Sequence, residues 1–273
     1  MKPPVINSPL LNNLKTLNAA NINEFREKGH TLIHEVVTRE EVAIYRPIIV
    51  NAAERYNTEK RNLQDRDTYG KAFLQIMNLW RVDAEVKQFV MAKRFAKIAA
   101  ELLGVENVRI YHDQALFKEA GGGPTPWHQD QYYWPIDTHN TVTMWMPLMD
   151  IDINMGMLTF ASGSFTKGAV FDFEISDESE SLFDKYVADN QFDITRAEVM
   201  AAGDATWHRG FTIHKAPGNY SDTMREVMTI IYVADGARVS APKNQWQHND
   251  LEKWLMNKPV GELIDSELNP AVL

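Results

Sequence analysis

The chain has 273 residues, of which 44% are hydrophobic and 24% charged, so it has enough apolar material for a full globular core. Its net charge of −9 and the scatter of its Lys and Arg residues argue against a nucleic-acid-binding protein, which usually carries a basic stripe. The absence of cysteine excludes disulfides, Fe–S clusters and a thiolate nucleophile, so any metal must be held by His and carboxylate side chains.

Residues 1–20 are predicted to form a loose N-terminal arm. They do not read as a signal peptide, because prolines interrupt them and no apolar stretch of signal-peptide length follows. The sequence lacks the run of roughly 18 apolar residues that spans a membrane. With the absence of cysteine, these features predict a cytoplasmic protein. A monomer or homodimer is expected. The expected partner is a small-molecule substrate, with neither a membrane nor a nucleic acid.

Residues 21–105 are predicted to be mainly helical. Thr38 and Glu41 have the spacing of a capping box, which marks the start of a helix. Apolar residues recur at helical spacing through residues 83–103, and Gly104 is a plausible helix stop. These helices are expected to pack on one face of a sheet.

Residues 106–240 have a different character, because short apolar segments alternate with turns rich in glycine. The predicted strands are 108–118, 141–151, 156–162, 198–208 and 225–235. Several short strands separated by such turns are typical of an antiparallel barrel or sandwich. The fold class expected is therefore α+β and mainly β.

The remaining segments complete a single predicted domain over residues 1–273, because no linker-like stretch divides the chain. The acidic residues 175–190 are predicted to form a helical insert or lid. A short helix near residues 249–257 is expected in the C-terminal segment, residues 241–273.

The residues most suggestive of chemistry are Trp127-His128-Gln129-Asp130. In an extended strand, residues i and i+2 point to the same face, so His128 and Asp130 could reach one ion together. Two His and one carboxylate on one face of an octahedron leave three open positions, which suits Fe(II). The H-x-D pattern alone is weak, because it occurs by chance in many proteins.

The later segment from His214 to Arg225 supplies the missing parts. His214 can be the third ligand, and Arg225 follows 11 residues later (225 − 214) at the start of a predicted strand. A planar guanidinium there could bind a carboxylate through two hydrogen bonds. His208 is the alternative third ligand; otherwise it is a core histidine or one that supports the ligands.

These residues resemble the phytanoyl-CoA dioxygenase family of Fe(II)- and 2-oxoglutarate-dependent oxygenases. The resemblance covers residues 108–235, through DQALFKEAGGGPTPWHQDQYYW, TMWMPLMDID and AGDATWHRGFTIHKAPGNYSDTMREVMTIIYV. It implies a double-stranded β-helix core of the jelly-roll or cupin type. It also implies Fe(II), 2-oxoglutarate and O2 as cofactor and cosubstrates, with ascorbate as a supporting reductant.

The resemblance also assigns roles to individual residues. His128, Asp130 and His214 match the metal ligands, which are also the catalytic residues. Arg225 matches the arginine that pairs with the distal carboxylate of 2-oxoglutarate, and Gln114 and Trp145 resemble residues that face it. The sequence departs from the family pattern at Phe165 and Ala216, where relatives have a histidine and a hydroxyl residue.

The family chemistry implies hydroxylation of an unactivated C–H bond in a small metabolite, with succinate and CO2 as coproducts. Desaturation and ring formation are open variants. Halogenation is not expected, because halogenating relatives have a small residue in place of Asp130. Acyl-CoA thioesters, amino acids, aminophosphonates and natural products are candidate substrates, and the absence of a basic cluster disfavours a CoA ester.

Candidate substrate-binding residues are Tyr132, Trp134 and Lys118. Core packing explains the aromatic residues about as well, and Lys118 could be a solvated strand end. His112, near Gln114, is interpreted as a buried core histidine.

Two other classes of protein remain open at this point. A zinc hydrolase could use a His-Asp-His site and a bound water, although it would not need Arg225. A non-catalytic β-barrel binding protein is the second alternative.

Overall fold

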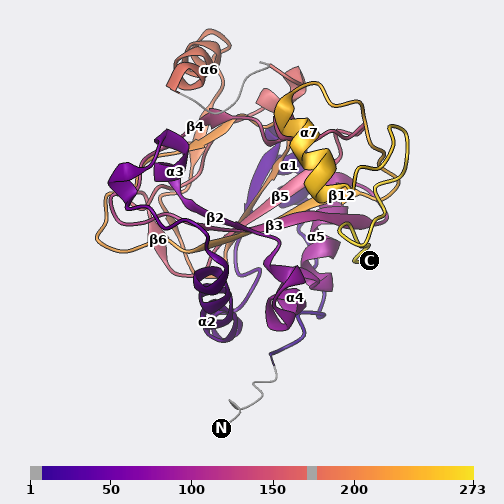
Figure 1. The fold of residues 1–273 in the computed structure, drawn as a ribbon, viewed down its shortest axis with the longest axis horizontal. Helices are drawn as coiled ribbons and strands as arrows, with labels where there is room; N and C mark the ends of the chain where they lie inside the picture. The colour runs from indigo at the N-terminus through magenta and orange to yellow at the C-terminus, as the bar shows by residue number, and fades with distance from the viewer. Residues whose placement is uncertain (1–7, 171–176) are drawn as a thin grey trace.

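Two antiparallel sheets form the centre of the computed structural model, which describes residues 8–170 and 177–273 (Figure 1). The larger sheet has the strand order β1-β10-β5-β12-β3-β2, and the smaller has the order β4-β11-β7-β8. The strands of the larger sheet are β1 (His30–Ile33), β2 (Leu74–Met77), β3 (Val108–Phe117), β5 (Thr141–Pro147), β10 (Ala205–Arg209) and β12 (Val227–Ala234). Those of the smaller sheet are β4 (Thr125–His128), β7 (Thr159–Ala161), β8 (Ile194–Arg196) and β11 (His214–Ala216), and the short β6 (Ile151–Asp152) and β9 (Val199–Met200) pair separately.

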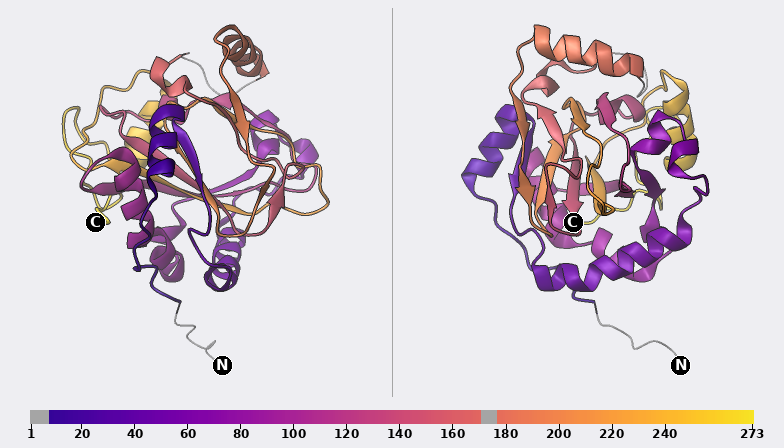
Figure 2. Two further views of the ribbon diagram at one scale, coloured as in Figure 1. Left: turned by 180° about the vertical axis from the view of Figure 1, so that it is seen from behind. Right: turned by 90° about the vertical axis from the view of Figure 1, so that its left-hand side faces the viewer.

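Helices lie on several sides of the sheets, with α2 and α6 on opposite sides of the molecule (Figure 2). The α-helices are α1 (Ala19–Lys28), α2 (Arg39–Tyr56), α3 (Thr68–Ala72), α4 (Ala84–Val90), α5 (Lys93–Leu103), α6 (Asp177–Asp189) and α7 (Gln245–Trp254). The 3-10 helices are η1 (Leu63–Asp65), η2 (Leu79–Arg81), η3 (Asp130–Tyr133) and η4 (Ser164–Lys167). None of the helices in the described ranges has the length and apolar character needed to cross a bilayer.

The larger sheet separates the main hydrophobic core from the interior between the sheets. In β5, Val142, Met144 and Met146 belong to the core cluster that contains α2, α4 and α5. The alternating residues Thr143 and Trp145 face the opposite side and line a cavity. This period of two is the expected consequence of the strand pleat, and it leaves the inner face available for polar side chains.

A β-bulge interrupts the pairing of β3 with β12. Ile110 pairs with Tyr232 and His112 pairs with Ile231, so Tyr111 has no partner across the ladder. The extra residue puts Tyr111 and His112 on the inner side of the sheet together. A simple alternation of inward and outward residues along this strand would not predict both positions.

Several local predictions are confirmed, whereas the edges of the larger sheet were missed. Thr38 and Glu41 form the predicted capping box, and Gly104 ends α5 with a φ of 72°. The predicted helix over residues 83–103 is two helices, α4 and α5. The edge strands β1 and β2 both come from the segment predicted to be helical, because four-residue strands carry too little periodicity to stand out.

The remaining segments also differ in detail. The predicted helix over residues 175–190 is α6, which begins at Asp177, and the C-terminal helix begins at Gln245 rather than near residue 249. Residues 1–7 of the predicted arm, and the start of the acidic stretch up to residue 176, lie outside the described residues.

Arg94 joins the N-terminal arm to the helices. Its guanidinium donates to both carboxylate oxygens of Glu41, at 2.7 and 2.8 Å. It also donates to the carbonyl oxygens of Val36, at 3.0 Å, and Asn13, at 3.1 Å. Because the Arg94 side chain is only 5% exposed, these bonds are shielded from solvent.

Replacing Arg94 by methionine should lower the free energy of unfolding by about 3 kcal/mol, because Glu41 would be left half-buried without its cation. The matched control is Lys97→Met on the same helix, which removes an exposed pair with Glu101 and should change stability by less than about 0.5 kcal/mol. Urea denaturation measures both. Equal effects of the two substitutions would show that Arg94 has no special role.

Candidate metal centre and cavity

Three candidate ligands converge from two neighbouring strands and a turn. His128 is the last residue of β4, and Asp130 begins η3 two residues later. His214 is the first residue of β11 and is the antiparallel register partner of His128. The convergence of His128 and Asp130 therefore arises from a strand running into a turn, not from the continuous strand assumed from the sequence.

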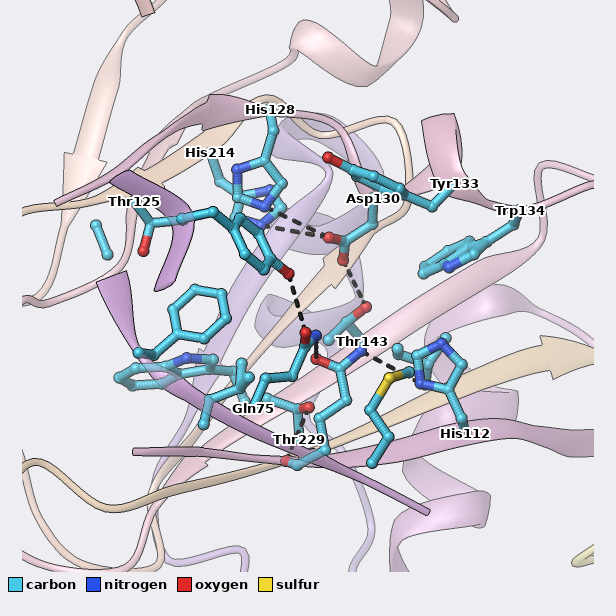
Figure 3. A pocket seen from close by; sticks show the side chains of 18 of the residues that line it. Gln75, His112, Thr125, His128, Asp130, Tyr133, Trp134, Thr143, His214 and Thr229 are labelled. Atoms are coloured by element: carbon cyan, nitrogen blue, oxygen red, sulfur yellow. Dashed lines mark hydrogen bonds and ion pairs between the residues drawn. The ribbon is translucent and has the colours of Figure 1, made fainter. Parts of the chain in front are cut away.

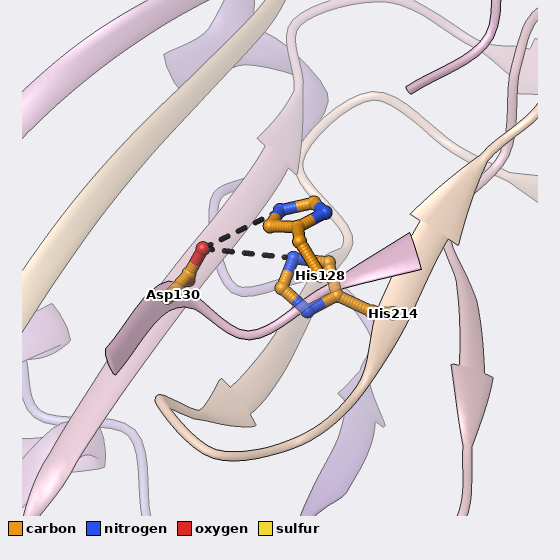
Figure 4. Close-up of side chains that lie close together, drawn as sticks. All are labelled: His128, Asp130 and His214. Atoms are coloured by element: carbon orange, nitrogen blue, oxygen red, sulfur yellow. Dashed lines mark ion pairs between the residues drawn. The ribbon is translucent and has the colours of Figure 1, made fainter. Parts of the chain in front are cut away.

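The ligand atoms of these residues form a compact set (Figure 4). Asp130 Oδ1 lies 3.6 Å from His128 Nε2 and 3.7 Å from His214 Nε2. All the candidate ligand atoms lie within 4.8 Å of one another. Two imidazoles and a carboxylate can therefore bind one ion.

Hydrogen bonds behind the two imidazoles prepare them for metal binding. His128 Nδ1 lies 2.8 Å from the Pro126 carbonyl oxygen, and His214 Nδ1 lies 2.9 Å from that of Thr212. A carbonyl oxygen only accepts, so each Nδ1 carries the proton and donates it. In the neutral form of each ring the lone pair is then on Nε2, which is the atom directed at Asp130.

The protonation states also suit a metal. Burial, with His128 and His208 nearby, holds the pKa of His214 well below its usual value, so this ring is neutral. Burial alone would raise the pKa of Asp130, but the neighbouring imidazoles of His214, His128 and His208 outweigh it and hold that pKa well below its usual value. Neutral imidazole and ionised carboxylate are the forms that bind metals.

The second oxygen of Asp130 is held by the larger sheet. Oδ2 accepts a hydrogen bond of 2.9 Å from Thr143 Oγ1 and one of 3.2 Å from His208 Nε2. These bonds leave Oδ1 turned toward His128 and His214. Since a carboxylate only accepts, His208 Nε2 carries a proton, so His208 is placed to support the carboxylate and His214 to complete the ligand set.

Arg225 is a buried cation without an acidic partner. Its side chain is 2% exposed, and no described Asp or Glu oxygen lies within 4.0 Å of it. It donates to the Gly156 carbonyl oxygen and lies 5.1 Å above the ring of Trp145, while its Nε has no partner within the described residues. Burial lowers its pKa to about 9, so it remains charged at neutral pH. A buried charge of this kind needs an anion, which a ligand can supply.

A cavity of about 690 Å³ contains both the ligand set and Arg225. Its inner wall is the face of the larger sheet that bears Gln114, Trp145 and Thr229. Figure 3 shows His112, Thr143 and Thr229 around this space, opposite His128 and His214. The predicted cosubstrate residues Arg225, Gln114 and Trp145 thus share one cavity with the candidate ligands.

The predicted substrate residues fall in different places. Trp134 lines the cavity, but Tyr132 does not, because the tight turn of η3 directs its neighbour Tyr133 inward instead. Lys118 lies outside the cavity wall, and its Nζ donates a hydrogen bond to the Gly123 carbonyl oxygen. Burial and the charge of Arg225 lower its pKa to about 6, so Lys118 is mostly neutral at pH 7.

Residues 165 and 216, where the sequence departs from the family pattern, lie in different parts of the structure. Ala216 lines the cavity, whereas Phe165 lies in η4, where its ring contacts the Arg209 guanidinium 5.3 Å away. The change at residue 216 therefore affects the wall near the metal ligands, and the change at residue 165 does not.

A chain of hydrogen bonds across the cavity was missed by sequence reasoning. Tyr69 donates to Gln75 at 3.0 Å, Gln75 donates to Gln114 at 3.1 Å, and Gln114 donates to His112 at 3.3 Å (Figure 3). Burial lowers the pKa of His112 to about 3, so its ring is neutral and can accept. The spacing of His112 and Gln114 in a strand was the one available signal, whereas Tyr69 and Gln75 are distant in sequence.

Residues 25–227 match the phytanoyl-CoA dioxygenase family, which is most of the chain. The protein therefore belongs to this family of Fe(II)- and 2-oxoglutarate-dependent oxygenases, as its motifs predicted. The chain is also 25% identical, over 228 residues, to a probable alpha-ketoglutarate-dependent hypophosphite dioxygenase from Stutzerimonas stutzeri. The aligned residues are 78% of each chain.

Solved structures with the same fold include three enzymes. The non-heme alpha ketoglutarate dependent carbocyclase SnoK from nogalamycin biosynthesis has a TM-score of 0.78 and 23% identity, over 94% of this chain and 97% of that chain. The epimerase SnoN has a TM-score of 0.74 and 19% identity, over 93% of this chain and 97% of that chain. EctD from S. alaskensis, with 2-oxoglutarate and 5-hydroxyectoine, has a TM-score of 0.67 and 18% identity, over 90% of this chain and 88% of that chain. At these identities the similarity concerns the fold, and it confirms the predicted double-stranded β-helix class.

His214→Ala should abolish Fe(II) binding, and His208→Ala should weaken it by about tenfold, because Asp130 would lose one of its two supporting donors. Anaerobic titration with Fe(II) measures both affinities without turnover. His248→Ala, at an exposed position on α7, is the matched control and should bind normally. If His208→Ala abolished binding while His214→Ala retained it, the ligand assignment would be reversed.

Proposed function

We propose that this protein hydroxylates an unactivated C–H bond of a small-molecule metabolite. The iron is held by His128, Asp130 and His214, and the cosubstrate 2-oxoglutarate by Arg225 with Gln114 and Trp145. Succinate and CO2 are the coproducts. Family membership supports the use of Fe(II) and 2-oxoglutarate, and the residue roles rest on the cavity.

The observation that carries this proposal is a buried, unpaired guanidinium in the same cavity as a three-ligand metal site. A dicarboxylate that binds the metal at one end would bring its other carboxylate to such a cation. Arg225 offers that carboxylate a charge-assisted hydrogen bond in a place shielded from water. The ring of Trp145 beneath the guanidinium limits the orientations it can adopt.

The side chains of this protein position and protect the reactants. His128, Asp130 and His214 would hold the metal, and the cavity beside them would admit its further ligands. When bound, iron with 2-oxoglutarate and O2 supplies an oxidant strong enough to take hydrogen from a C–H bond. The aromatic walls, including Tyr133 and Trp134, exclude water from the reacting atoms.

A zinc hydrolase fits these contacts less well. Such an enzyme needs a base beside the metal-bound water, but His208, the titratable side chain that contacts the ligand set within the described residues, already donates to Asp130. It also has no use for a buried Arg225. The intact ligand set, with its supporting hydrogen bonds, argues against the other alternative, a non-catalytic β-barrel binding protein.

Substitution of Arg225 by methionine should weaken 2-oxoglutarate binding by about 2 kcal/mol, or roughly thirtyfold, because a charge-assisted hydrogen bond is lost. Fe(II) affinity should not change, since Arg225 does not contact the metal ligands. Calorimetric titration of the metal-loaded protein measures both constants. Arg196→Met, an exposed arginine on β8, is the matched control. Unchanged cosubstrate affinity in Arg225→Met would contradict the assigned role.

The reaction itself is tested by succinate release and product mass. Purified protein with Fe(II), ascorbate and 2-oxoglutarate should release succinate slowly without substrate, and faster when candidate metabolites are screened. Hydroxylation adds one oxygen atom from O2, cyclisation or desaturation removes two hydrogens, and epimerisation leaves the mass unchanged. A product without added oxygen would overturn hydroxylation but keep the oxygenase class, whereas no 2-oxoglutarate turnover would overturn both.

A further inference from the structure

The outer part of the cavity is closed by one face of α7. The residues of this helix that line the cavity are Trp246, Asn249, Asp250, Lys253 and Trp254. Their successive spacings are three, one, three and one residues, so they form a single stripe along the helix. None of them belongs to the metal or cosubstrate sites described above.

The helix is fixed in place as a wall. Asn244 caps its first turn, and the side-chain amides of Asn244 and Gln247 both donate to the Tyr132 carbonyl oxygen, at 3.4 and 2.9 Å. Just after the helix, Leu255 is fully buried in a cluster with Tyr111 and Trp134. Side chains on the stripe are therefore held at defined positions relative to the metal ligands.

Asp250 is the acidic group of this wall, and half of its carboxylate is free. Tyr111 donates its hydroxyl to Asp250 Oδ2 at 2.7 Å. Among the described residues, no other side chain donates a hydrogen bond to the carboxylate. The Tyr111 ring packs against Trp134 at 5.4 Å, so the hydroxyl that orients Asp250 is itself fixed. The remaining oxygen can accept from a molecule in the cavity.

The surroundings of Asp250 indicate what kind of molecule fits. Six aromatic residues line the outer cavity: Tyr69, Phe73, Tyr133, Trp134, Trp246 and Trp254. Flat aromatic walls favour a ring-shaped, largely apolar body. Another acid of this region, Asp67, accepts a hydrogen bond of 2.7 Å from the Gly70 backbone and caps α3, so its carboxylate serves the start of that helix.

The charges of the wall favour a neutral ligand. Burial raises the pKa of the Asp250 carboxyl to about 7, although the hydrogen bond from Tyr111 and the charge of Lys253 on the same stripe lower it. The carboxyl therefore carries only part of its charge at neutral pH, and Lys253 is a cation on the same wall, so a ligand cation is not required. An anionic ligand would meet Asp250 itself and is disfavoured.

We propose that Asp250 determines substrate specificity by accepting a hydrogen bond from a hydroxyl group on a neutral, ring-containing substrate. Tyr111 acts as a positioning residue that orients the carboxylate. This proposal rests on the proposed oxygenase function, because Asp250 can select a substrate only if the ring that it binds lies between α7 and a reactive iron site. It narrows the substrate class to hydroxylated ring compounds.

The test compares two ring probes that differ in one donor, 2-naphthol and 2-methoxynaphthalene. Their affinities are measured by ligand-detected NMR titration of the full chain loaded with Zn(II) and 2-oxoglutarate, which prevents turnover. The native protein should prefer 2-naphthol by about tenfold, as expected for one hydrogen bond to a partly ionised carboxyl group. Asp250→Asn should lose most of this preference and bind 2-methoxynaphthalene as before.

Matched variants separate recognition from structure. Glu252→Gln removes the same charge from the exposed side of α7 and should bind both probes normally. Tyr111→Phe keeps Asp250 but frees its orientation, so it should show a smaller loss confined to 2-naphthol. This variant also provides the test if Asp250→Asn does not fold.

Several outcomes would overturn the proposal: no binding of either probe, no preference in the native protein, or an equal loss of both probes in Asp250→Asn. Tighter, Asp250-dependent binding of 2-naphthylmethylammonium would overturn the assignment to neutral substrates. The titrations are repeated with Zn(II) alone. If 2-oxoglutarate does not bind but the preference persists, the oxygenase function fails and the Asp250 site stands.

Discussion

The site depends on the way the Asp130 carboxylate is divided between the two sheets. One oxygen faces the imidazoles of His128 and His214, which come from the smaller sheet. The other is held by Thr143 and His208, which come from β5 and β10 of the larger sheet. The carboxylate therefore fixes the distance between the sheets at the point where a metal would bind, and any shift of one sheet would misdirect a ligand.

The division of the larger sheet into two faces makes this arrangement possible. Its outer face packs on the helices through large apolar side chains, and the stability gained there allows polar and charged groups on the inner face. Arg225 is the most costly of these, because it is buried, charged and without an acid in the described structure. Lys118 beside it avoids the same cost by being mostly neutral.

The parts of the site that could be predicted from sequence are those encoded within short segments. His128 and Asp130 are two residues apart, and the spacing of His214 to Arg225 spans one turn and the start of one strand. His214 could be preferred to His208 from this spacing, and the opposite proton positions of the two rings provide the physical reason. The outer cavity could not be predicted in this way, because α3, β2 and α7 reach it only through tertiary packing.

The bulge in β3 explains how residues of the larger sheet reach the outer cavity as well as the metal ligands. An unbroken ladder would put Tyr111 and His112 on opposite faces, and the Tyr111 hydroxyl would then lie among the helices. With the extra residue, His112 ends the hydrogen-bond chain from Gln114, while Tyr111 reaches across to Asp250 on α7. One inserted residue thus links the sheets that carry the candidate metal ligands to the C-terminal helix, through a contact that none of those ligands shares.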